Sequence, residues 1–254
     1  MIELPNIDAA TWELLISAKD ENEQRFFLSI SNLCCLEIEG KRKPAFDYRY
    51  GWLFNQFRDF LMDVNVSVDD FEKPEQKESL RKFHLLAYSL FWECTDIQRL
   101  LLSLVRTASG LEYDPDLIIA PDKRRRANSV YEEIRSKSKS LGLAFGDIIN
   151  SLYSNQLRNA IAHSELWISS DYLVLQNHDP KRNGSIGSIP IVEWDSIYTQ
   201  TLDLVAAIIR HRGIFRALLR SKCPYPITLA ELESTFNIIP DPRGGWNFES
   251  NPRK

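Results

Sequence analysis

The sequence predicts a mainly α-helical fold with one small antiparallel β insertion. Glycine is scarce, at 10 residues in 254, and long stretches repeat apolar residues at three- and four-residue steps, the period of a helix buried on one face. The stretch from 166 to 192 reads differently. "ELWISSDYLVLQ" and "SIGSIPIVEW" favour strands, and "NHDPKRNGS" between them is rich in turn residues. We therefore expect a helical bundle interrupted once by a β insertion.

The first part of the chain is expected to form three helices. Asp8 can cap the first of them, which continues through Ile16. A second helix is expected over about 21–39, with Gly40 as its stop and "KRKP" as the turn after it. The third, over about 46–64, repeats aromatic residues at helical steps, so one of its faces should be buried.

Four longer helices are expected in the rest of the chain. The longest covers about 74–108 and is closed by Gly110. After the proline-bounded loop "YDPDLIIAPD", a basic helix is expected over about 123–142. The helices over about 144–163 and 194–222 frame the β insertion.

These elements suggest one domain over 1–225. Its helical core should span about 75–222, with the N-terminal helices of 8–65 packed on it. The tail over 226–254 is expected to be irregular, because five of the twelve prolines follow Cys223.

Charge, cysteine spacing and the absence of cofactor motifs narrow the classes of protein to which this chain can belong. The formal net charge is -4, so any contact with nucleic acid must rest on a local basic patch. The four cysteines form neither a C-x-x-C pair nor a Cys/His metal spacing, which indicates reduced thiols in a cytoplasmic protein. No glycine-rich phosphate loop, Ser/His/Asp pattern or metal-ligand cluster stands out, and we expect no cofactor and no bound metal.

Targeting and membrane segments are not expected either. The N-terminal "MIELPNIDAATWELL" has no basic region before an apolar run, as a signal peptide would. The most apolar long stretch, "FHLLAYSLFWECTDIQRLLLSLV", carries Glu93, Asp96 and Arg99 in its middle, which indicates a core helix rather than a membrane span.

The stretch "SNQLRNAIAHSE", over 154–165, places polar residues where an apolar stripe should continue. If 144–163 is one helix, Gln156 and His163 fall near the middle of its apolar face and Asn159 at the edge. Buried amides and imidazoles are costly unless they are hydrogen-bonded. They therefore form either an internal network or the lining of a pocket or interface.

The same stretch contains "RNAIAH", which resembles the R-N-x-x-x-H signature of the HEPN superfamily (higher eukaryotes and prokaryotes nucleotide-binding domains). The resemblance covers about 75–222, including the order of motif helix, β insertion and final helix. It implies a helical bundle that dimerises, with the motifs facing a shared cleft. Many catalytic members are metal-independent endoribonucleases of toxin–antitoxin, abortive-infection and CRISPR-associated systems. Arg158 and His163 would then be the catalytic pair, supported by Asn159.

These residue types suit metal-independent cleavage of RNA by its 2′-hydroxyl. Histidine, with an ordinary pKa of about 6.5, can transfer protons near neutrality, and a guanidinium can meet the charge that gathers on the phosphoryl oxygens. The expected products are a 2′,3′-cyclic phosphate and a 5′-hydroxyl. Arg158 and His163, however, lie about 140° apart around a straight helix. Either the arginine curls around the helix end or two protomers supply the pair, which would make the apolar stripe an interface as well as a core.

One position departs from a HEPN subfamily. HEPN toxins paired with minimal nucleotidyltransferases carry a tyrosine two residues after the histidine, where adenylylation can silence them. Glu165 stands there in this chain, so this mode of control is not expected. Glu165 either pairs with Arg158 or is solvated.

Residues outside the motif are weaker candidates for RNA contacts. Basic residues before and after the motif could guide phosphates and two flanking aromatic residues could stack on bases, while solvated faces and ordinary packing are the competing interpretation. These candidates are Lys123, Arg124, Arg125, Arg126, Arg210, Arg212, Tyr153 and Trp167.

We therefore expect a HEPN-type endoribonuclease acting in a toxin, abortive-infection or stress-defence role. Its partners would be an RNA substrate, a second copy bound through the motif face, and an antitoxin or regulatory protein. The alternative is a non-catalytic HEPN module that binds a nucleotide or a partner protein. A third interpretation is a helical scaffold in which Gln156, Asn159 and His163 form a buried polar network.

Overall fold

The computed structural model describes residues 5–31, 33–38, 41–46, 74–112, 127–181, 184–229, 234–242 and 246–250. It confirms a mainly helical chain with small antiparallel sheets. The helix expected over 46–64 lies almost entirely outside the described residues, as does the proline-bounded loop before the basic helix.

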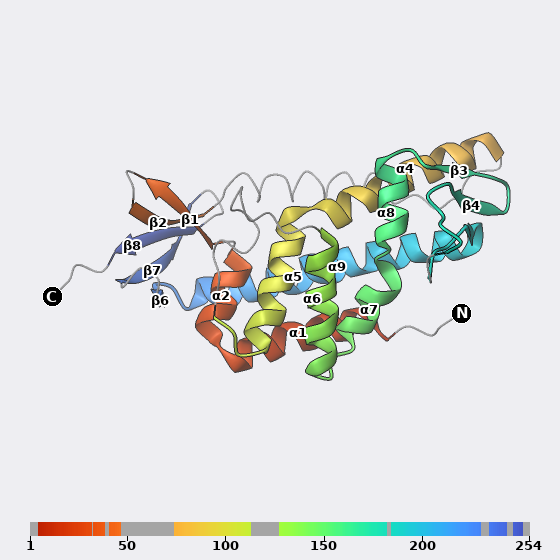
Figure 1. Ribbon diagram of the computed structural model, residues 1–254. Coiled ribbons are helices and arrows are strands. Elements are labelled where there is room, and N and C mark those ends of the chain that lie inside the picture. The colour runs from red at the N-terminus through yellow and green to blue at the C-terminus, as the bar shows by residue number, and fades with distance from the viewer. Residues whose placement is uncertain are drawn as a thin grey trace.

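The long helix α9 (Ile191–Ser221) runs along the molecule, and several other helices pack on it (Figure 1). Its N-terminal end lies beside the β insertion, and its C-terminal end leads to the sheet formed by the tail. α1 (Ile7–Glu21) packs along α9, and α5 (Thr95–Ala108) packs on α1.

The first helix begins slightly earlier than expected. Asn6, not Asp8, is its N-cap, and the Asn6 Oδ1 atom accepts a hydrogen bond from the Ala9 N–H at 3.1 Å. Asp8 lies in the first turn instead, where a carboxylate is favourable to the helix dipole. Its side chain also accepts from His211 Nε2 at 2.8 Å, which ties α1 to α9.

The helix expected over 21–39 is wrong in its second half. α2 ends early and spans Glu23–Ser31. β1 (Leu33–Ile38) then pairs antiparallel with β2 (Lys41–Phe46), so "KRKP" is strand rather than turn. A short apolar run such as "LCCLEI" fits the period of a helix or of a strand, and here pairing with a neighbouring strand decides between them.

The helix expected over 74–108 is broken at Cys94. α4 (Pro74–Glu93) and α5 are separate helices, so the prediction of one continuous helix is wrong. The break frees the Trp92 carbonyl, which accepts from the Gln98 side chain at 2.8 Å and from the Tyr131 hydroxyl at 3.2 Å. Both donors are buried, so one local and one long-range side-chain hydrogen bond, rather than a proline or glycine, stabilise the break.

A second predicted helix is also broken. α6 (Ala127–Ser140) ends two residues before Gly142, where the helix was expected to end, and Gly142 has a φ of 71° that suits glycine. The helix expected over 144–163, however, divides into α7 (Phe145–Leu152) and α8 (Asn155–Ala162).

Ser154 and Tyr88 stabilise this second break. The Ser154 hydroxyl caps α8 by accepting from the Leu157 N–H at 3.1 Å. The buried Tyr88 hydroxyl donates to the Leu152 carbonyl at 2.9 Å and accepts from the Ser154 N–H at 3.1 Å. One side chain of α4 thus satisfies the backbone groups on both sides of the break.

A cluster of aromatic rings underlies both breaks. Trp92 contacts Tyr131 and Tyr153 edge-to-face, with centroids 5.0 and 5.3 Å apart, and also contacts Tyr88. Such geometries are favourable to aromatic pairs. The ends of α4 and α7 are therefore fixed relative to each other by one buried cluster.

The β insertion is confirmed. β4 (Tyr172–Leu175) lies between β3 (Leu166–Ile168) and β5 (Ser188–Pro190), and both pairings are antiparallel. α9 follows directly and ends one residue before the expected Lys222.

The expectation of an irregular tail is wrong. β6 (Tyr225–Leu229), β7 (Ser234–Pro240) and β8 (Trp246–Ser250) form an antiparallel sheet with β7 in the middle. The proline count misled because Pro226 lies on an edge strand and Pro240 ends the central strand, where prolines are tolerated.

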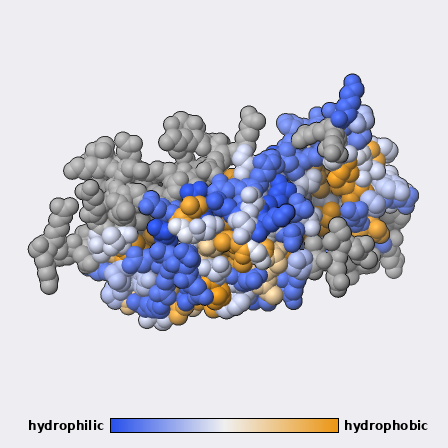
Figure 2. All heavy atoms as spheres, turned by 60° about the horizontal axis from the view of Figure 1, so that its bottom comes forward, coloured by the Kyte–Doolittle hydropathy of each residue, from blue (hydrophilic) through white to orange (hydrophobic). Residues whose placement is uncertain are grey.

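The core unites these parts. Buried apolar residues from α1 through α9 and from the tail sheet belong to one cluster. Among the described residues, no helix is long and apolar enough to span a bilayer. The face shown in Figure 2 mixes hydrophilic surface with patches of hydrophobic residues.

Candidate functional site

The candidate site lies where α8 meets the C-terminal end of α4. Arg158 is anchored there by three acceptors from its own chain. Its Nη1 atom donates to the Glu93 carboxylate, and its Nη2 atom donates to Asn155 Oδ1 at 3.0 Å and to Asn159 Oδ1 at 2.7 Å. Two amide oxygens on one nitrogen fix the plane of the guanidinium.

Arg158 carries its charge in a partly dry environment. Its side chain is 16% exposed, and burial lowers the pKa of Arg158 from its ordinary value, while the nearby Tyr88 acts in the opposite direction. Its Nε atom is buried and has no hydrogen-bond partner among the described residues. The contacts of Arg158 therefore offset a real desolvation cost.

Asn159 accepts a hydrogen bond from the guanidinium of Arg158, and its supporting role in catalysis stays a prediction. His163 lies elsewhere. It is the exposed C-cap of α8, and its ring makes no hydrogen bond or ion pair in the part of the chain that the structure describes. Among the described residues, the side chains of Arg158 and His163 share neither a hydrogen bond nor a common partner, as expected from their separation around the helix.

Glu165 does not pair with Arg158 in this structure; Glu93 takes that place. The backbone beyond the motif turns sharply. Ser164 has a φ of 57°, and the Glu165 N–H donates to the Ala160 carbonyl at 2.8 Å. This turn ends α8 and starts β3.

The break before α8 changes the interpretation of Gln156. Its side chain faces the β insertion, where Nε2 donates to the Ile186 carbonyl at 2.7 Å and Oε1 accepts from the Ile186 N–H at 2.9 Å. Nε2 also donates to Asn177 Oδ1 at 3.3 Å, and Asn177 Nδ2 donates back to the Gln156 carbonyl at 3.0 Å. Gln156 is thus hydrogen-bonded within the chain, where it holds the β insertion against α8.

A groove of about 430 Å³ lies beside the turn that joins α8 to β3. Ile161 and Ser164 form one wall, Leu85 and Leu86 of α4 another, and Trp167 of β3, which is 53% exposed, also lines it. Ile161 and Ser164 flank His163 in the chain, so the groove begins close to the motif.

The other candidates for RNA contacts are scattered. Tyr153 is buried in the aromatic cluster, whereas Trp167 is exposed at the groove. Arg212 is buried and donates from Nε to the Ile30 carbonyl at 3.0 Å. Burial, together with Arg216, lowers the pKa of Arg212 to about 9. The run Lys123, Arg124, Arg125 and Arg126 lies outside the described residues.

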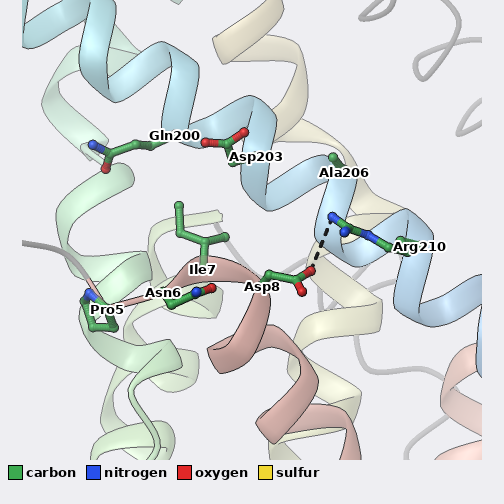
Figure 3. A pocket seen from close by; sticks show the side chains of 8 residues that line it. All are labelled: Pro5, Asn6, Ile7, Asp8, Gln200, Asp203, Ala206 and Arg210. Carbon is green, nitrogen blue, oxygen red and sulfur yellow. Dashed lines mark ion pairs between the residues drawn. The ribbon is translucent and has the colours of Figure 1, made fainter.

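Arg210 lines a second cavity, of about 390 Å³, between the start of α1 and α9. Its guanidinium pairs with Asp8 at 3.3 Å, and Gln200 and Asp203 lie along the same face of α9 (Figure 3). The cavity is formed by the start of α1 and the middle of α9, and Arg158 does not line it.

Sequence reasoning missed Glu93, Asn155 and Tyr88. Asn155 carried a usable signal, because a side chain three residues before Arg158 lies on the same helix face. Glu93 and Tyr88 carried none, because their roles depend on the two helix breaks.

Among the described residues, no group of three or more histidine, cysteine, aspartate or glutamate side chains could hold a metal ion. Comparisons with protein-family models, with curated proteins and with solved structures find no match to this chain.

Proposed function

We propose that the protein is a metal-independent endoribonuclease of HEPN type. The observation that carries this proposal is the environment of Arg158 within "RNAIAH": a partly dry guanidinium whose plane is fixed by Asn155 and Asn159, on the same short helix as an exposed His163. A fixed charge in a partly dry site is the arrangement that stabilises charge developing on a phosphoryl group.

In the proposed reaction the RNA 2′-hydroxyl attacks its own phosphorus. His163 exchanges protons with the attacking or leaving oxygen, which an exposed imidazole without a competing partner can do. Arg158 donates to the non-bridging oxygens. The bond to the 5′-oxygen breaks, which leaves a 2′,3′-cyclic phosphate and a 5′-hydroxyl.

The proposed site is composite, with Arg158 and His163 supplied by different copies of the chain. The separation of the two side chains around α8 supports this. α4 also exposes Phe83, Leu86 and Leu90, at 54%, 48% and 44%, and these form an apolar stripe next to the groove. Exposed apolar stripes of this kind are typical of protein–protein contacts. A role in defence or stress, restrained by an antitoxin or regulatory protein, belongs to the same proposal.

The test is cleavage of mixed structured and unstructured RNA with EDTA present. We expect the wild type to leave cyclic phosphate ends, and His163→Ala and Arg158→Ala each to lose at least about 100-fold in rate. His178→Ala, which alters an exposed histidine in the insertion, is the matched control and should cleave normally. Each variant must keep the wild-type circular dichroism spectrum and oligomeric state.

Mixing the two inactive variants tests the composite site. In a mixed dimer, one of the two sites receives both wild-type residues, so subunit exchange between His163→Ala and Arg158→Ala should restore about a quarter of the wild-type activity. No recovery after proven subunit exchange would assign both residues to one copy.

One observation favours a non-catalytic module instead. Both Nη atoms of Arg158 already have acceptors within the chain, as they would in a structural role. In that case no RNA would be cleaved, and Arg158→Ala would lower thermal stability rather than an activity.

A further inference from the structure

Glu93 occupies the outer face of Arg158 because of the break at Cys94. It is the last residue of α4, and the chain turns into α5 immediately after it. Its carboxylate accepts from Nη1 of Arg158. The two side chains differ in exposure, since Glu93 is 45% exposed and Arg158 only 16%. Glu93 can therefore move into water while Arg158 stays in place.

The remaining contacts of Arg158 do not depend on Glu93. Asn155 and Asn159 both accept from Nη2 and come from α8 itself, as Arg158 does. If the carboxylate leaves, the guanidinium keeps its plane and presents Nη1 to the exterior. Nη1 is therefore the donor that a competing anion would meet, because both acceptors of Nη2 would still be in place.

Carboxylates and phosphodiesters are alternative partners for such a donor set. Each presents two oxygens sharing one negative charge, and arginine binds either through its planar fork. A partly exposed ion pair has little net stability, so a competing anion can displace it.

We propose that Glu93 is an internal competitor for the anion site at Arg158, and that an RNA phosphodiester binds by taking the place of the Glu93 carboxylate. The identity of the ligand as RNA rests on the proposed ribonuclease function. The exchange of the Glu93 carboxylate for another anion, called the exchange below, rests on the contacts of Arg158 alone. The inference predicts whether mutation of Glu93 raises or lowers the affinity for RNA. Removing a competitor strengthens binding, whereas removing a positioning residue weakens it.

The experiment measures binding, not cleavage. A fluorescent single-stranded 2′-O-methyl oligoribonucleotide has no free 2′-hydroxyl, so its affinity can be followed by anisotropy with the motif intact. Glu93→Gln keeps the shape of the side chain and removes its charge. Glu13→Gln is the matched control: it makes the same charge change on α1, at an exposed residue with no ion pair among the described residues.

We expect Glu93→Gln to bind about fivefold more tightly than the wild type, which corresponds to about 1 kcal/mol. Glu13→Gln should change affinity less than twofold, because distant charges are screened. In an Arg158→Ala background, Glu93→Gln should give no gain. Equal or weaker binding by Glu93→Gln, or a gain that persists without Arg158, would overturn the inference.

The result is independent of catalysis. If Glu93→Gln binds more tightly through Arg158 but the wild type cleaves no RNA, the exchange stands and the ribonuclease proposal fails. If the wild type cleaves RNA and Glu93→Gln shows no gain in affinity, the ribonuclease proposal stands and the exchange fails.

Discussion

Tyr88→Phe should destabilise the protein through the break between α7 and α8. The substitution removes the Tyr88 hydroxyl group and nothing else, so the ring can keep its position. Its loss leaves the Leu152 carbonyl and the Ser154 N–H without the hydrogen bonds they make at 2.9 and 3.1 Å. The side chain is fully buried, so water cannot readily replace the hydroxyl.

The expected cost follows from these two groups. A buried donor or acceptor left without a partner costs about 1–3 kcal/mol, and Ser154 is only partly buried, so the total should be about 2–4 kcal/mol. For a chain of this length, that lowers the melting temperature by roughly 5–12 °C. Urea unfolding followed by circular dichroism measures the change, and the slope should stay constant if both variants unfold in one step.

Tyr198→Phe is the matched control. Tyr198 is also buried, but its hydroxyl has no hydrogen-bond partner among the described residues. Removing it should leave the free energy of unfolding unchanged or raise it slightly. If Tyr88→Phe were as mild as Tyr198→Phe, the Tyr88 hydroxyl would not be what stabilises the break, and the account of how α8 is placed would be refuted.

Three further predictions concern the same region. Ser154→Ala removes the N-cap of α8 and should cost about 1 kcal/mol in urea unfolding, with faster hydrogen exchange in α8 and not in α7; equal exchange in both would contradict a local role. Gln156→Ala removes the side-chain hydrogen bonds to Asn177 and Ile186, so the backbone amides of 176–181 and 184–187 should exchange hydrogen faster. The free energy of global unfolding should change little. Unchanged amide exchange would show that other contacts hold the insertion. Burial raises the pKa of the Cys94 thiol to about 11, so iodoacetamide at about pH 8 should label Cys94 only after urea unfolding, as peptide mass spectrometry would show.

The sequence predicts those parts of the fold whose signals are local. α6, α9 and the β insertion follow from periodicity, turn residues and the glycine at 142. The two helix breaks could not be predicted in this way. At Cys94 the decisive groups are Gln98 and Tyr131, and at Ser154 the decisive group is Tyr88, 66 residues away in the chain. Helical periodicity continues across both breaks because the flanking residues remain buried.

In the candidate site, too, contacts between residues close in the chain could be predicted and contacts that depend on the helix breaks could not. The contact between Arg158 and Asn155 could be predicted, because residues three apart lie on the same face of a helix. The contact with Glu93 was not, because it requires α4 to end where it does. The helical wheel also misplaced Gln156 and His163, since it assumed a single helix through the break at Ser154.

The polar residues of "SNQLRNAIAHSE" therefore have different physical explanations. Gln156 is explained by the insertion, and Asn159 by Arg158; both are hydrogen-bonded within the chain, so neither requires an external ligand. Arg158 also has acceptors at both Nη atoms, but one of these acceptors is the half-exposed carboxylate of Glu93. His163 has no side-chain hydrogen bond in the part of the chain the structure describes, and its exposure removes any structural need for one. Stability alone accounts for Gln156 and Asn159; the proposed ribonuclease would use the two features that the chain leaves accessible, the exposed imidazole of His163 and the half-exposed carboxylate on Arg158.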